Sequence, residues 1–324
     1  MSAAAQHVYL QNFLEPLAPF LAMPGLTDLF VNRPGEVWTE CLGRSIERHE
    51  VPELDHARLL RLARQIAASS AQGINRESPL LSASLPDGSR VQIVLPPATR
   101  GEVAIAIRKH AVQNLSLEAY RGAGIASQVE LEEGASDVDS ADMVEQLRAA
   151  VKARKNILIS GGTGSGKTTL LNALLGEVPD NERLIVIEDT PELMIRHSNS
   201  VGLLATRGRT GEADVTAEDL LIASMRMRPD RIILGEIRGN EATTFLRAIN
   251  TGHPGSISTI HANSAEQAID QLAFIVLQAG ASFSWGDVVN YVRRSIDLFV
   301  KIERYDVNVH IEISLAFKKD DLSN

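Results

Sequence analysis

The fold of this 324-residue chain is decided by the stretch Ile157-Leu158-Ile159-Ser160-Gly161-Gly162-Thr163-Gly164-Ser165-Gly166-Lys167-Thr168. It begins with the apolar run of a buried strand, and a helical pattern follows from Gly166 to Leu175. A glycine-rich turn between a strand and a helix, ending in Lys-Thr, is the pattern of a P-loop. Its backbone N–H groups can point at phosphates, and the positive end of the helix adds to their attraction. The alternative is a glycine-rich turn that binds no ligand. Such a turn would not require Lys and Thr at this offset, so the Lys-Thr pair favours a P-loop.

The P-loop predicts a Mg²⁺-dependent ATPase with ATP as its nucleotide. We expect Lys167 to bridge the β- and γ-phosphates and Thr168 to place its hydroxyl on Mg²⁺. The residues expected to bind the nucleotide are Gly161, Gly162, Thr163, Gly164, Ser165, Gly166, Lys167, Thr168 and Thr169.

Carboxylates follow two apolar, strand-like runs further along the chain. Glu188, Asp189 and Glu192 follow one run, and Glu236 follows the other. Because the carboxyl ends of parallel strands lie near the P-loop, these side chains are candidates for positioning the attacking water. Glu236 is favoured for this role and Glu188 competes with it. Simple pairing with an arginine is the alternative, and it weighs most for Asp189 and Glu192.

The metal site has one unusual feature. The strand that precedes such a glutamate usually ends in an aspartate, and Gly235 stands there instead. We therefore expect Thr168, the phosphates and water to hold most of the Mg²⁺ shell. Glu188, Asp189 and Glu236 would reach the ion through water.

Two histidines flank the apolar run 257–260. A lone histidine is more often a satisfied polar group, but a pair around one strand, with a Gly/Pro turn before it, favours a site. We expect His253 to contact the γ-phosphate or relay its presence, and His261 to link neighbouring elements. Phosphoryl transfer also commonly uses an arginine from outside the P-loop domain. Arg90 and Arg108, on two predicted N-terminal strands, are candidates, with exposed strand cations as the alternative.

The chain changes character along its length. The N-terminal third mixes a helical pattern at 57–71 with short strand patterns, whereas apolar strands and helices alternate after the P-loop. Acidic residues with Gly and Ser fill the segment between them. The fold class is therefore α/β, with a mostly parallel sheet covered on both faces in the C-terminal part. The predicted boundaries are 1–122 for an N-terminal α+β domain, 123–142 for an acidic linker and 143–324 for the P-loop domain.

Composition excludes several classes of protein. The net charge of −9 and the pI near 5.4 disfavour direct nucleic-acid binding, which draws its affinity from neutralised phosphates. The single cysteine, Cys41, excludes a disulfide within the chain and a four-cysteine zinc site, and it fits a reducing cytosol. Neither a leader peptide nor an apolar run of about 20 residues is apparent, so any membrane association is expected to be peripheral.

Several motifs together resemble those of the secretion traffic ATPases. Within that superfamily the chain is most similar to the branch of eleventh VirB proteins, from type IV secretion and conjugation systems. Besides the P-loop, the matching segments are Asn32-Arg33-Pro34-Gly35-Glu36, Leu95-Pro96-Pro97, Ile107-Arg108, Ile187-Glu188-Asp189, Arg226-Met227-Arg228-Pro229-Asp230-Arg231, Gly235-Glu236 and Gly252 to His261.

The resemblance implies a RecA-like C-terminal domain that sandwiches the nucleotide with the N-terminal domain, in a ring-shaped homohexamer. It implies that the boxes around Glu188, Glu236 and His253 serve hydrolysis, and that Arg90 and Arg108 reach the terminal phosphate. The implied location is the cytoplasmic face of the inner membrane. The implied role is to power secretion-system assembly and the transfer of protein or DNA, with other secretion ATPases and inner-membrane channel components as partners.

Other functions stay open at this point. A RecA-type nucleic-acid motor is disfavoured by the charge, and a nucleotide-binding scaffold without turnover is disfavoured by Glu188, Glu236 and His253 together. A pilus extension or retraction ATPase would share the C-terminal domain but lack the Asn-Arg-Pro-Gly turn. Type II secretion relatives carry a tetracysteine zinc module, which one cysteine cannot form.

Overall fold

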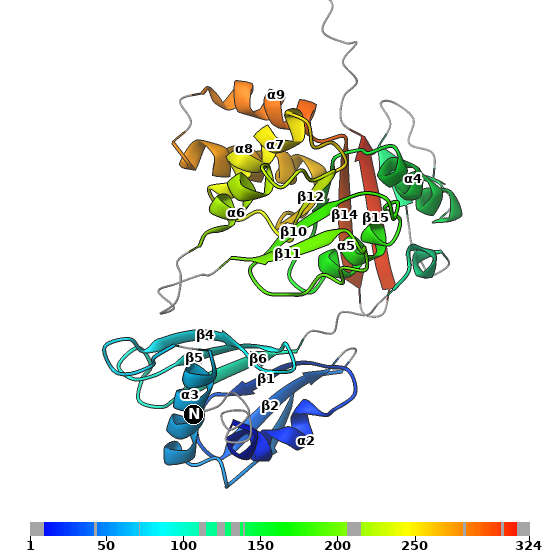
Figure 1. Ribbon diagram of the computed structural model, residues 1–324. Coiled ribbons are helices and arrows are strands. Elements are labelled where there is room, and N and C mark those ends of the chain that lie inside the picture. Colours follow the sequence, from blue (N-terminus) through cyan, green and yellow to red (C-terminus); the bar gives the residue numbers. More distant parts are fainter. Residues whose placement is uncertain are drawn as a thin grey trace, which may run out of the picture. The chain divides into compact units, whose positions relative to one another are not determined.

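A computed structural model describes residues 10–41, 44–70, 72–109, 115–121, 127–130, 137–138, 140–205, 215–280, 283–305 and 308–315. The described residues fall into two compact units, drawn in Figure 1. Of the described residues, unit 1 contains those up to 109 and unit 2 those from 115 on. Each unit is described by itself.

Unit 1 is a six-stranded antiparallel sheet with helices packed against it. The strand order is β3-β2-β1-β6-β5-β4. The strands are β1 (Leu26–Val31), β2 (Glu36–Cys41), β3 (Glu47–Glu50), β4 (Leu80–Ser84), β5 (Arg90–Val94) and β6 (Ala104–Arg108), and the helices are η1 (Glu15–Leu17), α2 (Ala18–Leu21) and α3 (His56–Ser69). The predicted α+β character of this part is confirmed.

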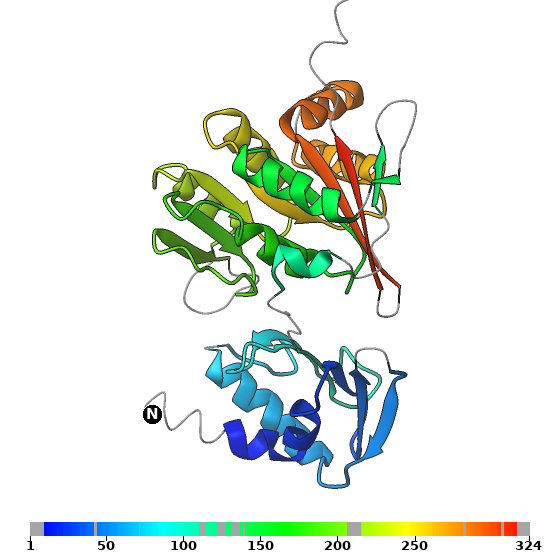
Figure 2. The same cartoon turned by 90° about the vertical axis from the view of Figure 1, so that its right-hand side faces the viewer.

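The helix α3 provides the largest helical contribution to the core of unit 1 (light blue in Figure 2). Its start is capped by Asp55, whose side chain accepts from the backbone N–H of Arg58 at 2.6 Å. Leu59, Leu62 and Ile66 recur at helical spacing and are fully buried. Their burial against alternate residues of the strands holds helix and sheet together.

Unit 2 is a nine-stranded sheet in the order β11-β10-β12-β13-β9-β14-β15-β7-β8. The strands from β11 to β14 are parallel, whereas β14 and β15 form an antiparallel hairpin. The strands are β7 (Ser127–Glu130), β8 (Asp137–Val138), β9 (Ile157–Ser160), β10 (Leu184–Glu188), β11 (Ser200–Leu204), β12 (Arg231–Leu234), β13 (Ile257–Ile260), β14 (Leu298–Tyr305) and β15 (Asn308–Leu315).

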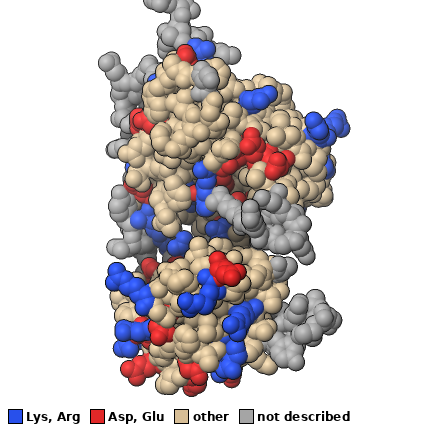
Figure 3. Space-filling model, turned by 90° about the vertical axis from the view of Figure 1, so that its left-hand side faces the viewer, with Lys and Arg blue, Asp and Glu red and all other residues tan. Residues whose placement is uncertain are grey.

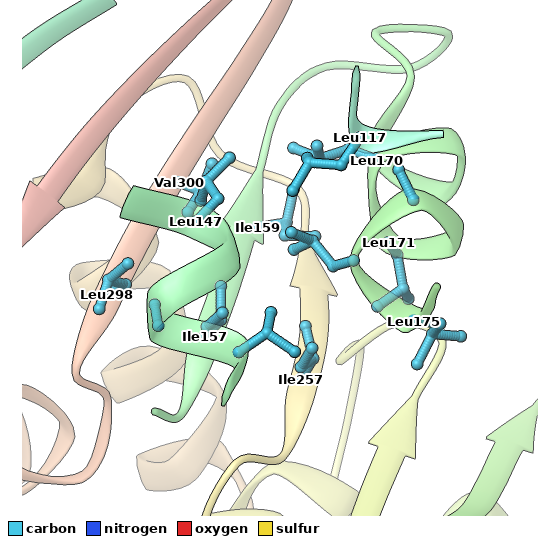
Figure 4. Packing of buried hydrophobic residues seen from close by; sticks show 14 of the residues in the cluster. Leu117, Leu147, Ile157, Ile159, Leu170, Leu171, Leu175, Ile257, Leu298 and Val300 are labelled. Carbon is cyan, nitrogen blue, oxygen red and sulfur yellow. The ribbon is translucent and has the colours of Figure 1, made fainter. Parts of the chain in front are cut away.

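Helices cover both faces of this sheet (Figures 1 and 2). On one face lie α4 (Ser140–Lys152) and α5 (Lys167–Leu175), and on the other lie α6 (Ala217–Ser224), α7 (Glu241–Asn250), α8 (Ala265–Gln278) and α9 (Trp285–Ser295). Strand β9 shows why both faces must be covered. Ile157 and Ile159 point into the core on the α5 side, shown in Figure 4, and Leu158 points into the opposite core. The predicted parallel, doubly covered sheet is confirmed.

The boundary between the units differs from the predicted linker at 123–142. A short helix, η2 (Leu117–Tyr120), already belongs to unit 2, because Leu117 is buried in one cluster with Leu170 and Leu171 of α5 (Figure 4). Part of the acidic segment forms β7 and β8, and β7 pairs with β15. Backbone pairing and apolar burial thus override the local acidic composition. Residues 123–126, 131–136 and 139 of the predicted linker lie outside the described residues.

Candidate nucleotide site

The phosphate-binding turn lies at the carboxyl edge of the unit 2 sheet, between β9 and α5. A Cβ at Gly161 would lie 2.4 Å from the backbone oxygen of Ile302 on β14, so only glycine fits there. Gly166 caps α5 with φ at 101°, a left-handed conformation that favours glycine. The turn is therefore held tightly against β14 and directs the first N–H groups of α5 outward.

Lys167 is buried within this turn. Its Nζ donates hydrogen bonds of 2.7 Å to the carbonyls of Gly161 and Gly162. Burial lowers the pKa of Lys167, and the carboxylate of Glu236 opposes that shift. Phosphate oxygens offer the ammonium a stronger, charge-assisted partner than two carbonyls do, so the site is suited to an anionic ligand.

Glu236, which follows β12, acts electrostatically on Lys167 and shares His261 with it as a neighbour. Its Oε2 accepts from Arg238. Its Oε1 lies 2.8 Å from Nε2 of His261, although among the described residues this buried oxygen accepts no hydrogen bond of good geometry. The Nδ1 of His261 is 3.5 Å from Nζ of Lys167. Burial, followed by the charge of Lys167, lowers the pKa of His261. Lys167, Arg238 and His261 thus surround the carboxylate of Glu236.

Glu188 lies on the neighbouring strand and anchors a loop. Its Oε1 accepts from the backbone N–H groups of Glu192 and Leu193, both at 2.8 Å. A Cβ at Gly235 would lie 3.4 Å from Cγ of Glu188. A side chain at 235 would therefore be in van der Waals contact with the side chain of Glu188.

Glu192 contacts Thr168, the expected metal ligand. Its Oε2 accepts from the Thr168 hydroxyl at 3.3 Å. Among the described residues, no group of three or more His, Cys, Asp or Glu could hold a metal. Mg²⁺ that arrives with a nucleotide needs only one or two protein oxygens besides phosphate and water, so Thr168 with Glu192 behind it fits that ion. The sequence pattern favoured Glu236 and Glu188 over Glu192, because the local residues do not predict how the loop of Glu192 folds.

The two predicted histidines lie at opposite ends of strand β13. His261 follows β13 at the carboxyl edge, whereas His253 precedes it, and its Nδ1 lies 3.2 Å from the oxygen of Pro229. Four strand residues between them span roughly 13 Å. Within unit 2 the structure does not bring His253 to Lys167.

The two predicted arginines belong to unit 1. Arg90 and Arg108 lie directly opposite each other on β5 and β6. Arg108 pairs with Asp28 at 2.9 Å and is about half exposed. The pair therefore presents two cations on one pair of strands.

Two cavities adjoin the turn. One, of about 500 Å³, is lined by Gly161, Gly162, His261, Ala262, Asn263, Gln267, Asp270, Gln271, Phe274 and Trp285. The other, of about 350 Å³, is lined by Gly162, Thr163, Gly164, Ser165, Asn263, Glu303 and Arg304. The two cavities share Gly162 and Asn263, so open space adjoins the turn along its length. None of the described helices is both long enough and apolar enough to cross a bilayer.

A phosphate turn at the carboxyl edge of a doubly covered parallel sheet, with its lysine beside a strand-end glutamate, defines a P-loop ATPase of RecA-like fold. Comparison with known proteins places it more narrowly. The family model "Type II/IV secretion system protein" matches residues 11–300, and the chain belongs to that family. It is a VirB11-like secretion ATPase, an enzyme that hydrolyses ATP.

Individual relatives agree with this assignment. The chain is 38% identical over 316 residues to the type IV secretion system protein VirB11 of Bartonella quintana, covering 90% of this chain and 88% of that protein. It is 41% identical over 313 residues to the type IV secretion system protein PtlH of Bordetella pertussis, covering 90% and 89%. Among solved structures, the Brucella suis VirB11 ATPase in complex with sulphate matches with a TM-score of 0.50 and 36% identity, covering 97% and 96%. The pilus retraction motor PilT, with a TM-score of 0.62 and 19% identity over 96% of this chain and 83% of that one, shares the fold.

Proposed function

We propose that this ATPase works as a ring-shaped hexamer on the cytoplasmic face of the inner membrane. There it powers the assembly of a type IV secretion system and the transfer of substrate through it, with other secretion ATPases and inner-membrane channel components as partners. The observation that carries the proposal is the contact group of Lys167, Glu236 and His261 at the phosphate turn. The names of the relatives supply the secretion role.

Each side chain of the group has a distinct task in hydrolysis. Lys167 leaves the carbonyls of the turn and neutralises the β- and γ-phosphates. Oε1 of Glu236 is the oxygen open to accept a hydrogen bond from the attacking water. The Nε2 of His261 lies 2.8 Å from the same oxygen without a hydrogen bond of good geometry, and the lowered pKa of His261 favours the neutral ring.

Thr168 and Glu192 are the residues that would hold Mg²⁺, directly and through water respectively. When bound, the ion neutralises charge that develops on the phosphates. Glu188 contributes indirectly, because its two backbone hydrogen bonds fix the position of Glu192.

Arg90 and Arg108 complete the proposal. In it, nucleotide closes the N-terminal unit onto the P-loop unit, these arginines reach the γ-phosphate, and hydrolysis releases the clamp. Their position as cross-strand neighbours supports a joint role, since one displacement of β5 and β6 would carry both. Removal of the N-terminal unit is expected to lower turnover, and unchanged turnover would rule out the clamp.

A nucleic-acid motor of RecA type is the second candidate, and the charge distribution disfavours it. On the face drawn in Figure 3, basic side chains are intermingled with acidic ones. With a net charge of −9, the chain has no excess of cations to neutralise a phosphate backbone. Such a motor would show DNA-stimulated hydrolysis that falls steeply with salt.

The experiment that tests the proposal compares Lys167→Ala with Lys152→Ala. Lys152 is an exposed lysine at the end of α4 and serves as the control. We expect the first variant to lose phosphate release and to fail in complementing substrate transfer, while the second retains both. Hydrolysis by purified Lys167→Ala protein would overturn the site assignment, and a stable monomer in native mass measurements with ATP would overturn the ring.

A further inference from the structure

The segment that follows β12 contains Arg238, whose main chain and side chain are both held by neighbouring elements. The backbone N–H groups of Arg238 and Gly239 both donate to Oε1 of Glu241, at 2.6 and 2.8 Å. The N–H of Ile237 donates to the carbonyl of Thr259 on β13 at 2.8 Å. The main chain at Arg238 is therefore tied to α7 and to the neighbouring strand.

The guanidinium of Arg238 links two predicted carboxylates. Its Nε and Nη2 both contact Oε2 of Glu236, and its Nη1 lies 3.9 Å from Oδ2 of Asp189. Glu236 follows β12 and Asp189 follows β10, so one side chain spans the ends of two adjacent strands. The side chain of Glu236 is 15% exposed and that of Arg238 is 37% exposed, so the carboxylate is the more buried partner of the pair.

The two oxygens of Glu236 thereby become different. Oε2 is occupied by two charge-assisted contacts, which reduce its capacity to accept from anything else. Oε1 is buried, lies 2.8 Å from Nε2 of His261 and, among the described residues, accepts no hydrogen bond of good geometry. An arginine is suited to this task, because its planar fork can place two nitrogens on one oxygen whereas a lysine offers a single point charge.

We propose that Arg238 is a positioning residue for hydrolysis, which fixes Glu236 through Oε2 so that Oε1 faces the phosphate turn and the attacking water. The inference rests on the proposed role of Glu236 in that reaction. Arg238 would thus act in hydrolysis as an arginine of the P-loop domain, in addition to Arg90 and Arg108 of the N-terminal unit. Arg238 acts through Glu236 and needs no contact with nucleotide.

The test uses the full chain and four variants: Arg238→Gln, Arg238→Lys, Glu236→Gln and the double variant with glutamine at both positions. Arg247→Gln, on the exposed side of α7, is the control. We expect Arg238→Gln to lower kcat by about 10- to 100-fold, a part of the roughly 100-fold or more that a well-placed general base supplies. KM and the affinity for ADP should stay within about threefold, since Lys167 and the turn are untouched. Arg238→Lys should recover only part of the rate.

The double variant separates positioning from mere support. If Arg238 acts through Glu236, adding Arg238→Gln to Glu236→Gln should lower the rate by no more than about twofold. Additive losses, or an equal rise in KM, would overturn the proposal. Thermal unfolding of each variant verifies folding, and Arg238→Lys carries the test if the glutamine variant does not fold. Retained hydrolysis in Lys167→Ala would refute the proposed function itself, so the two failures are distinguishable.

Discussion

The hydroxyl of Thr168, on the P-loop helix, donates a hydrogen bond of 3.3 Å to the carboxylate of Glu192. Glu192 reaches that position because its own backbone N–H is bound by the carboxylate of Glu188 at 2.8 Å. Two glutamates of one acidic box therefore have different tasks: Glu188 shapes the loop, and Glu192 faces the residue expected to carry the metal.

This division of tasks predicts a specific loss in Glu192→Gln. The concentration of Mg²⁺ that gives half-maximal hydrolysis should rise by about 10-fold or more, the usual scale for losing an outer-shell partner of a metal ligand. A Mg²⁺ titration of the hydrolysis rate measures it. Glu266→Gln, on the exposed first turn of α8, is the control and should leave the titration unchanged. An unaltered Mg²⁺ dependence in Glu192→Gln would remove Glu192 from the metal site.

Sequence patterns predicted the parts of this site that depend on local structure. The P-loop and the strand that ends before Glu236 are local patterns, and in the structure His261 lies close to both Lys167 and Glu236. Which glutamate faces Thr168 depends on two backbone hydrogen bonds made by Glu188 within its loop, and residue spacing does not encode them. The hairpin of β14 and β15 was not predicted either. Its residue Ile302 lies directly against the phosphate-binding turn at Gly161.

The close approach of β14 predicts that alanine substitution changes stability at one of two adjacent glycines and not at the other. In Gly161→Ala the new methyl group would meet the Ile302 carbonyl, which is backbone and cannot move aside, so the turn itself must shift. We expect the free energy of unfolding of unit 2 to fall by about 1–3 kcal/mol and nucleotide affinity to drop with it. In Gly162→Ala no atom lies within 4 Å of the added carbon, and stability should change by no more than about 0.5 kcal/mol. Chemical denaturation of both variants measures the difference, and equal losses would contradict this packing.

A pH dependence is predicted for unit 1 from Glu36. The indole N–H of Trp38, with Arg33 and Arg48, lowers the pKa of Glu36 from 4.5 to about 2. Because the folded pKa is depressed, the stabilisation is fully present above pH 4.5 and is lost as the pH falls towards 2. Glu36→Gln should flatten the pH dependence of unfolding in that window, whereas Glu50→Gln, exposed on β3, should not. Trp38 fluorescence in a Trp285→Phe background reports unit 1 alone, since the chain has 2 tryptophans. A pH profile unchanged by Glu36→Gln would refute the assignment.

The placement of the two histidines predicts unequal effects on turnover. The ring of His261 lies 2.8 Å from Glu236 and 3.5 Å from Lys167, so His261→Ala should lower kcat by about 10-fold or more. The ring of His253 contacts the oxygen of Pro229 at the opposite edge of the sheet, so His253→Ala should keep kcat within about threefold and lose some stability instead. Steady-state kinetics and unfolding curves of both variants decide between them. If folded His253→Ala protein did not hydrolyse ATP, this prediction would be wrong. The catalytic group would then have to include a residue of another subunit that lies near His253.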